Sequence, residues 1–362
     1  MRNYFELNDD ELKRADKLYE ESLVIDFLTF VGGELKNEEE YFKMVKNAGV
    51  SAVHVTVNQQ PNGFRQAIQG LDEWGRKIEK SDIAVLATTV DDILEAKKND
   101  KIAFIAGWQN AKPFEDNIKN VRVFKKLGLR VVLLAYHYQN FVASGGGERH
   151  DGGLSRFGIN LVRELNQQGI LIDLSHCGPQ SVLDAIKYSQ APVAITHANP
   201  AAFGDHPRNK SDEALKACAE KGGMIGLSAW SEHLETKLGR RPTIHDFIEM
   251  IDYVVNLIGV DHVGFGLDLT PLLEQDGPRG YKYLGGIYPE AFNSKYEERN
   301  FEGLSDYDCV INITRGLVAR GYSDEDIKKI NGENWIKFLK KVWGNPPKID
   351  NVEIEGHIVG GA

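Results

Sequence analysis

The sequence lacks the long apolar runs from which membrane-spanning helices are built. No stretch of its 362 residues approaches the roughly 18 to 20 consecutive apolar residues that such a helix needs. The amino terminus is polar, without the basic stretch and apolar core of a secretion signal. These absences predict a protein that has no membrane partner and works in the cytoplasm.

Cysteine and clustered positive charge are also scarce. The chain has three cysteines, Cys177, Cys218 and Cys309, which are too few and too scattered for a disulfide framework, in keeping with a reducing compartment. Acidic residues outnumber basic ones by 53 to 43, and no segment gathers the basic stripe that binding to a phosphate backbone requires. The composition therefore argues against a nucleic-acid partner and leaves a small molecule as the expected one.

What the sequence does contain is a series of short β-branched runs that alternate with helical stretches. Nine runs are bounded by turn residues and are predicted as strands: 23–30, 51–57, 83–89, 102–108, 130–137, 169–176, 193–199, 222–230 and 262–269. Stretches with helical periodicity lie between them: 64–80, 115–127, 157–168, 179–189, 211–221 and 243–258. Runs that are hydrophobic almost end to end are typical of strands buried on both faces, as in a parallel sheet covered by helices.

Eight such strands suit a closed (β/α)8 barrel of the TIM type, with 83–89 as an extra strand because a helical segment follows it directly. The competing architecture, an open doubly wound sheet, usually has a Gly-rich phosphate turn after its first strand, and residues 24–33 (VIDFLTFVGG) do not form one. No linker divides the chain. We predict one barrel domain over residues 1–343, including an N-terminal helix, followed by a C-terminal tail over 344–362.

Polar residues close several of these apolar runs, and the carboxyl ends of barrel strands are where active sites lie. The residues concerned are Gln109, Tyr136, His137, His176, His197 and Asp268. His176 and His197 end consecutive strands, so their imidazoles are expected side by side. With a carboxylate such as Asp268 they would suit zinc and leave a position open for water. The alternative is that both histidines are hydrogen-bonded structural residues.

A long charged loop follows His197 and contains Arg208. A guanidinium binds a carboxylate through two parallel hydrogen bonds, and loops after barrel strands reach the substrate, so Arg208 is a candidate for holding a substrate carboxylate. The alternative is a structural ion pair with Asp205 or Asp212.

Five segments together resemble the renal or membrane dipeptidase family of the amidohydrolase superfamily. They are GLSRFGINLVRELNQQGILIDLSH (153–176), APVAITHANP (191–200), DHPRNKSDEALKACAEKGGMIG (205–226), VGFGLDL (263–269) and INGENWIKFLKKVWG (330–344). The resemblance runs from about residue 23 to residue 344. It implies a (β/α)8 barrel of the metal-dependent hydrolase type, often a homodimer, that binds two zinc ions and hydrolyses dipeptides with a free carboxylate.

The resemblance also implies roles for individual residues. His176 and His197 would be ligands of one zinc, Asp268 a zinc ligand or proton acceptor, and Arg208 the group that holds the substrate carboxylate. Tyr136 stands where the family has a histidine that polarises the substrate, and His137 is next along the chain. The further candidates for substrate contacts are Trp108, Gln109 and Asn140.

The sequence departs from the family at the other half of the metal site. The family's first strand ends in an Asp-Gly-His-x-Asp pattern that supplies two ligands, whereas here Asp26 is followed by Phe27, Leu28, Thr29 and Phe30. Gln109 stands in place of a bridging glutamate, and a neutral amide does not bridge two dications as a carboxylate does. We therefore expect at most one zinc ion, held by the two histidines and completed by Asp268 or Gln109.

The resulting expectation is a dipeptidase-like, metal-dependent hydrolase that acts on an amide or related C–N bond of a small, carboxylate-bearing, amino-acid-like substrate. Asp268 would take a proton, Arg208 would fix the carboxylate, and Tyr136 or His137 would stabilise the oxyanion. Two alternatives stay open. One is a lyase or isomerase that uses the same residues without a metal, and the other is a binding protein that has lost catalysis.

Overall fold

The computed structural model describes residues 4–29, 38–57, 63–270, 277–289, 292 and 294–347. Position 30 and most of the expected tail lie outside these residues. Nine strands are present in the described residues: β1 (Ile25–Thr29), β2 (Ala52–Thr56), β3 (Ala84–Leu86), β4 (Ile102–Trp108), β5 (Val131–Leu133), β6 (Leu171–Asp173), β7 (Ala194–Ile195), β8 (Met224–Leu227) and β9 (Val263–Phe265). All their pairings are parallel.

Eight of these strands close into a barrel. The order runs from β2 through β1, β9, β8, β7, β6 and β5 to β4, and β4 then pairs with β2 to complete the ring. β3 pairs with the first half of β4, through Ala84 and Ile102, while β5 pairs with its last residues, through Gly107 and Val131. β3 therefore lies outside the ring. The predicted (β/α)8 barrel is confirmed, and so is the assignment of 83–89 as the extra strand.

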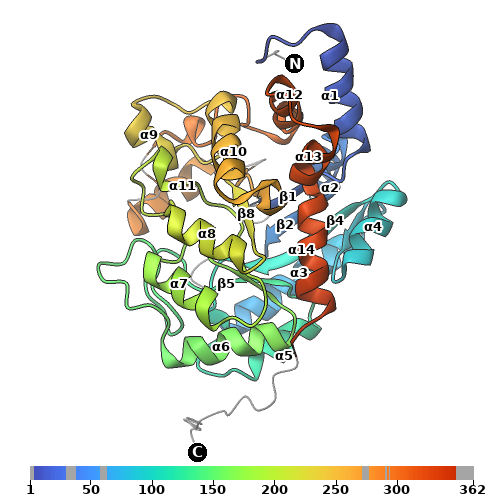
Figure 1. Ribbon diagram of the computed structural model, residues 1–362. Helices are drawn as coiled ribbons and strands as arrows, with labels where there is room; N and C mark the ends of the chain where they lie inside the picture. Colours follow the sequence, from blue (N-terminus) through green and yellow to red (C-terminus); the bar gives the residue numbers. More distant parts are fainter. Residues whose placement is uncertain are drawn as a thin grey trace, which may run out of the picture.

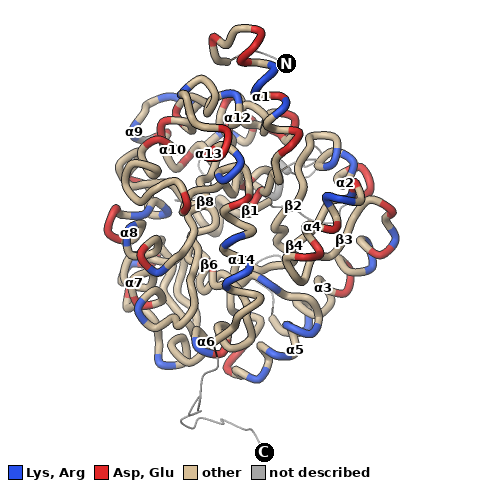
Figure 2. Tube along the Cα trace, turned by 45° about the vertical axis from the view of Figure 1, so that its right-hand side comes forward, with Lys and Arg blue, Asp and Glu red and all other residues tan. Residues whose placement is uncertain are grey.

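Helices surround the barrel as an outer layer (Figure 1). They are α1 (Asp9–Glu21), α2 (Glu38–Asn47), α3 (Phe64–Glu79), α4 (Val90–Lys98), α5 (Asn120–Lys126), α6 (Arg156–Gln167), α7 (Pro179–Tyr188), α8 (Asp212–Glu220), α9 (Glu232–Leu238), α10 (Ile244–Ile258), α11 (Gly277–Ile287), α12 (Ile311–Ala319), α13 (Asp324–Lys328) and α14 (Asn334–Gly344). None of the described helices is both long and apolar enough to cross a membrane. Basic and acidic side chains alternate along the helices, whereas the strands are mostly uncharged (Figure 2).

One helix begins later than the sequence predicts. The stretch 115–127 was expected to be helical throughout, but α5 starts at Asn120. Glu115 ends a short 3-10 turn with a φ of 53°, a left-handed conformation that an α-helix cannot contain. The periodicity of the apolar residues did not reveal this break.

The amino-terminal end of the barrel is closed by α14, which lies in front of the strands in the ribbon of Figure 1 and in the tube of Figure 2. Trp335 stacks on Phe27 of β1 with ring centroids 3.9 Å apart. A Cβ atom at Gly264 would lie 2.5 Å from the Trp335 ring nitrogen, and one at Gly226 would lie 3.1 Å from its ring, so the indole fits only because glycines stand there. The carboxyl ends of the strands form the opposite end of the barrel, which we call the mouth.

A buried carboxyl group joins the first and last strands. Asp26 on β1 accepts hydrogen bonds from the backbone N–H groups of Leu267 (2.7 Å) and Leu28 (3.3 Å) and from the Tyr307 hydroxyl (3.2 Å). Burial raises the pKa of Asp26 to about 7, although these donors oppose the shift. Asp26 therefore links β1 to the end of β9 by hydrogen bonds, but its burial makes ionisation of the carboxyl group unfavourable.

Replacing Asp26 with asparagine should change how stability depends on pH. The folded-state pKa of about 7 lies above the ordinary value near 3.9, so the stability from protonated Asp26 is complete below about pH 4 and is lost as the pH rises through 7. Asp26→Asn keeps an acceptor oxygen for Leu267 and cannot ionise, so it should gain stability relative to the parent from pH 5 to pH 8. Urea unfolding at both pH values measures the difference. The exposed Asp116→Asn is the control, and a parent–Asp26→Asn difference that stays constant with pH would contradict the argument.

Candidate functional site

Two histidines meet at the mouth of the barrel. β6 ends at Asp173 and β7 at Ile195, so His176 and His197 lie in the loops just after these strands rather than inside them. Their Nε2 atoms are 3.0 Å apart, and both side chains are buried. The structure thus brings together the two imidazoles that the sequence pattern placed side by side.

The carboxylate of Asp173 sets the position of His197. Its Oδ1 accepts hydrogen bonds from the Ser175 N–H (3.0 Å), the Ser175 hydroxyl (2.5 Å) and the Thr196 N–H (3.1 Å), which tie the end of β6 to the end of β7. Its Oδ2 lies 3.6 Å from Nδ1 of His197, and that nitrogen also meets the Thr196 hydroxyl at 2.7 Å. The imidazole of His197 is therefore held through its Nδ1 atom, and its Nε2 atom faces His176.

Both histidines are held in their neutral form. Burial is the main cause that lowers the pKa of each imidazole well below its usual value, and the positive charge of Arg208 adds to it. A neutral imidazole is the form that binds a metal ion or accepts a proton. At neutral pH the pair can do either.

Tyr136 and His137 stand beside this pair. The Tyr136 ring stacks on His176 with centroids 4.1 Å apart, and the His137 ring meets His176 edge-on at 4.8 Å. His137 has a φ of 53°, and both of its buried ring nitrogens have no hydrogen-bond partner within the described chain. A buried imidazole with two unsatisfied nitrogens is a costly arrangement unless a ligand meets it.

Asp268 follows β9 at the same mouth. Its φ is 58°, and it shares this unusual backbone conformation with His137. Burial raises the pKa of Asp268 to about 6, while Arg208 opposes the shift and the negative charge of Asp173 adds to it. Left-handed conformations are strained in non-glycine residues and occur often at functional sites. The surrounding structure therefore holds both residues in a backbone conformation that they would not adopt on their own.

Arg208 reaches the site from the loop after His197. Its Nε donates to the Ser175 carbonyl (3.2 Å) and its Nη2 to the His197 carbonyl (2.8 Å). The guanidinium is thus fastened to both histidine loops by one edge. Asp212, one of the two aspartates considered as a structural partner, instead accepts hydrogen bonds from the Tyr253 hydroxyl. No carboxylate among the described residues forms an ion pair with Arg208, which leaves its charge available to an anionic ligand.

The other three candidates are placed differently from one another. Gln109 lies at the end of β4 and donates from Nε2 to the Thr56 hydroxyl at the mouth (3.1 Å). Trp108 points the opposite way, because side chains alternate along a strand, and packs against Phe124 with ring centroids 4.4 Å apart. Its expected place at the substrate is therefore wrong. Asn140 uses its amide to hold its own loop, donating to Asn110 and Leu134 and accepting from the backbone of residues 142 and 143.

The spacing of the His176 and His197 nitrogens is compatible with two ligands of one metal ion. Two nitrogen ligands of one zinc, each about 2.0–2.1 Å from it, lie roughly 3.3 Å apart, close to the 3.0 Å between the Nε2 atoms of His176 and His197. On the other side of the mouth, Thr29 donates its hydroxyl to the Leu269 carbonyl, and Gln109 is tied to Thr56. Within the described ranges no three His, Cys, Asp or Glu side chains are grouped closely enough to hold an ion, so Asp268 is not assembled with the histidines as a third ligand.

A glycine-rich segment links the loops that hold these residues. Gly146 donates its N–H to the His176 carbonyl (2.7 Å), and Gly147 donates to the His137 carbonyl (2.9 Å). A Cβ atom on Gly146 would lie 2.6 Å from the Pro207 carbonyl oxygen, beside Arg208, and one on Gly145 would lie 2.2 Å from the His137 carbonyl carbon. Only glycine permits the segment to pass this closely between three loops.

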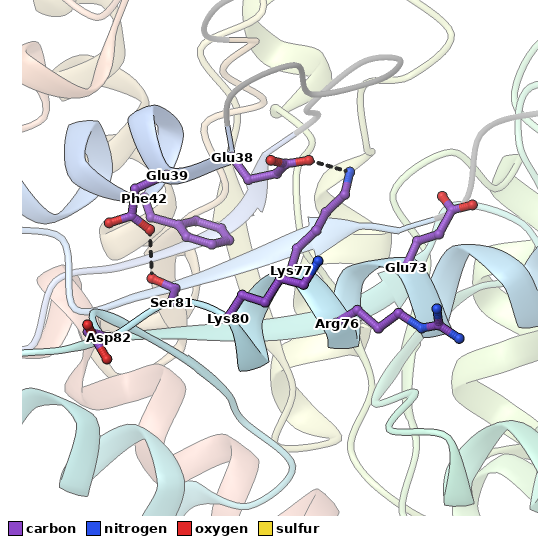
Figure 3. Close-up of a pocket in the computed structure, with 9 residues that line it drawn as sticks. All are labelled: Glu38, Glu39, Phe42, Glu73, Arg76, Lys77, Lys80, Ser81 and Asp82. Atoms are coloured by element: carbon purple, nitrogen blue, oxygen red, sulfur yellow. Dashed lines mark hydrogen bonds and ion pairs between the residues drawn. The ribbon is translucent and has the colours of Figure 1, made fainter.

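A separate pocket of about 520 Å³ lies on the outer side of the barrel between α2 and α3. Two of its acidic lining residues bond to other lining residues: Glu38 to Lys77 at 3.0 Å, and Glu39 to the Ser81 hydroxyl at 2.9 Å (Figure 3). None of the candidate site residues lines it. The pocket therefore adds nothing to the chemistry at the mouth.

Sequence reasoning missed the residues that support and cover the site. Asp173 and Thr196 were recognisable as polar side chains at the ends of apolar runs, directly before the histidines. Tyr288 and Phe292, which pack on His137 with centroids 5.0 and 6.3 Å away, come from a segment far along the chain. No local pattern could have placed them there.

Comparisons with known proteins agree with one another. Residues 34–275 match the family model of the membrane dipeptidases, peptidase family M19. The chain is 30% identical over 283 residues to dipeptidase tcpJ of Claviceps purpurea (strain 20.1), covering 77% of this chain and 60% of that protein. The chain thus spans less than two thirds of the length of that relative.

Solved structures show the same likeness. An amidohydrolase from Pseudomonas aeruginosa superposes with a TM-score of 0.82 at 34% identity, over 91% of this chain and 99% of that one. A metallopeptidase from Rhodobacter sphaeroides, bound to a phosphinate mimic of the dipeptide L-Ala-D-Ala, superposes with a TM-score of 0.71 at 19% identity, over 88% of this chain and all of that one. At that identity the second likeness concerns the fold alone.

A methyl group at Gly146 should disturb the site while one at Gly152, in the same segment, should not. Gly146→Ala forces a Cβ against backbone, which does not give way, and should lower the free energy of unfolding by about 1–3 kcal/mol. A Cβ on Gly152 meets nothing within 4 Å, so Gly152→Ala should stay within about 0.5 kcal/mol of the parent. Chemical denaturation of the three proteins measures both values. Equal stability of the two variants would show that the segment is not held tightly.

Proposed function

Because the chain belongs to the membrane dipeptidase family, peptidase family M19, we propose that it hydrolyses the amide bond of a small amino-acid-like substrate with a free carboxylate, using at most one metal ion. The observation that carries the proposal is the meeting of neutral His176 and His197, partly protonated Asp268 and unpaired Arg208 at one barrel mouth. Such a set combines groups that hold an anion with groups that accept a proton.

His176 and His197 are the residues that would hold the ion, whose chemistry is to make water more acidic and to polarise a carbonyl group. Asp173 and the Thr196 hydroxyl keep the His197 ring in one orientation, as supporting groups do behind metal-bound histidines. His176 is held by its stacking on Tyr136. These contacts fix the two nitrogens before any ligand arrives.

Asp268 is the group that accepts the proton from water. With a pKa near 6 its carboxylate is largely ionised at neutral pH, yet it is basic enough to accept a proton. Arg208 binds the substrate carboxylate through the edge that the two loop carbonyls leave unused. The Tyr136 hydroxyl and the one N–H group of the neutral His137 ring, whose nitrogens have no partner among the described residues, are the donors available to the oxygen that gains charge.

A panel of dipeptides, assayed with and without added zinc, tests the proposal. We expect hydrolysis of at least some members and none of the corresponding dipeptide amides that lack the free carboxylate. Hydrolysis without any bound metal would contradict the metal-dependent part of the proposal. Metal-free conversion to products other than the two amino acids would favour the lyase or isomerase alternative, in which the same histidines and Asp268 act as acid and base. Binding of dipeptides without turnover would favour a protein that has kept recognition and lost catalysis.

Removing one histidine should remove the metal. The parent, purified without chelators, should contain no more than one equivalent of divalent metal per chain by elemental analysis, and His197→Ala should contain almost none, because a single imidazole holds zinc weakly. The exposed His150→Ala is the matched control and should keep the parent's content. Two equivalents in the parent, or an unchanged content in His197→Ala, would contradict this assignment.

Arg208 should decide whether the substrate carboxylate matters. The parent should prefer a free acid over its methyl ester by about 30-fold or more in kcat/KM, equivalent to roughly 2 kcal/mol for a shielded charged contact. Arg208→Lys should lose most of this preference, because an ammonium group does not reproduce two parallel hydrogen bonds. Arg149→Lys, an exposed arginine in the neighbouring segment, is the control. Equal use of acid and ester by the parent would make Arg208 a purely structural residue.

Two further proposals concern the setting of the protein. Its three cysteines are all unpaired, which supports a reducing compartment such as the cytoplasm. The resemblance to the family supports a homodimer. Sedimentation of the purified protein tests the second of these.

A further inference from the structure

One side of the barrel mouth is covered by aromatic rings that the roles above do not use. They are Trp230, from the loop after β8, together with Tyr281, Tyr288 and Phe292, from α11 and the residues after it. We refer to these four residues as the aromatic roof. Three of its rings pack in series: Trp230 lies 5.8 Å from Phe292, and Phe292 lies 5.4 Å from Tyr281, between centroids. Both Phe292 and the fourth ring, Tyr288, pack on His137. α11 lies beside α9 in the ribbon view (Figure 1), and Glu232 of α9 hydrogen-bonds to Tyr281.

Polar contacts hold the roof in place. The buried carboxylate of Glu232 accepts hydrogen bonds from the Tyr281 hydroxyl and from the Ser294 N–H (2.8 Å). Arg299 donates to the Thr270 hydroxyl (2.6 Å) and carbonyl (3.1 Å), just after β9, and its guanidinium stacks 4.0 Å from the Tyr296 ring centre. The Tyr296 ring in turn lies 5.8 Å from that of Tyr281, so both sets of contacts hold the Tyr281 end of the roof.

The roof meets the groups that act on the carbonyl. Tyr288 lies 5.0 Å from His137 and 5.2 Å from Tyr136 between ring centroids, and Phe292 lies 6.3 Å from His137. Tyr136 and His137 are the proposed donors to the carbonyl oxygen. Arg208, which takes the carboxylate, approaches from the loops after β6 and β7. The mouth thus has a charged side for the carboxylate and an apolar side next to the carbonyl that is attacked.

We propose that the aromatic roof binds the side chain of the amino-terminal residue of a dipeptide and selects substrates in which this side chain is aromatic or large and aliphatic. The inference rests on the proposed function, because it takes the carbonyl at His137 as the one attacked. The amino-terminal residue supplies that carbonyl, so its side chain lies nearest to Tyr288 and Phe292. The carboxyl-terminal residue, held at Arg208, is turned away from the roof.

Dipeptides with a constant carboxyl-terminal alanine and an amino-terminal glycine, alanine, leucine or phenylalanine test this inference. In the parent, kcat/KM for Phe-Ala should exceed that for Gly-Ala by about 10- to 100-fold, as expected for burying one large apolar side chain. Tyr288→Ala should reduce this ratio by about tenfold, and Tyr288→Phe, which keeps the ring, should preserve it. Tyr283→Ala is the matched control, because Tyr283 lies on the same helix with 63% of its surface exposed.

Several results would overturn the inference. If the parent has the same kcat/KM for Gly-Ala and Phe-Ala, the roof is not selective. If Tyr288→Ala lowers kcat/KM by the same factor for both dipeptides, the substitution has damaged the structure and not the selectivity. If thermal unfolding shows that Tyr288→Ala does not fold, Phe292→Ala replaces it with the same expectation.

A separate measurement distinguishes failure of the roof from failure of the proposed function. If the parent hydrolyses none of the four dipeptides, the proposed function has failed, and calorimetric binding of the same dipeptides then tests the roof. Tighter binding of Phe-Ala than of Gly-Ala that disappears in Tyr288→Ala supports the inference. Equal binding of the two dipeptides by the parent overturns it.

Discussion

The geometry of the mouth depends on one carboxylate, that of Asp173. One of its oxygens accepts three hydrogen bonds that join the end of β6 to the end of β7, and the other lies behind the ring of His197. Separating the two strand ends would break the hydrogen bonds to Oδ1 of this buried carboxylate, whose Oδ2 has no hydrogen-bond partner among the described residues, and would therefore cost free energy. The 3.0 Å separation of the two histidine nitrogens follows from this constraint.

The other elements of the site are attached to the same two loops. Arg208 is fastened to the carbonyls of Ser175 and His197, and the Gly146 N–H is bonded to the carbonyl of His176. Hydrogen bonds therefore join Arg208, the loops of the two histidines and the loop of His137 into one connected network. Rigidity of this kind lowers the reorganisation needed when a substrate binds, which is the main source of rate enhancement in preorganised sites.

The two ends of the barrel differ: the amino-terminal end is packed with apolar side chains, and the carboxyl end carries the polar site residues. At the amino-terminal end, Trp335 fills the interior against Phe27, and the contacts there are apolar. At the carboxyl end, the side chains inside the ring become polar, and strain appears in the backbone of His137 and Asp268. The well-packed end supplies the stability that holds the strained end in place, so substitutions can alter the mouth while the fold persists.

Three features could be predicted from the residues alone: the alternation of strands and helices, the extra strand at 83–89, and the polar residues that follow the strands. They could be predicted because the periodicity of apolar residues is a local property of the chain. The family resemblance also led to the expectation of at most one metal ion, because Thr29 and Gln109 stand near positions where the family has ligands. The sequence did not show that Trp108 faces the helices, because this depends on how β4 is placed in the barrel. It also did not show that α5 begins late, because this depends on the backbone angle of Glu115. The roof over His137 was decided only by the tertiary structure, because α11 and the loop after β8 come together through closure of the barrel, which no local pattern encodes.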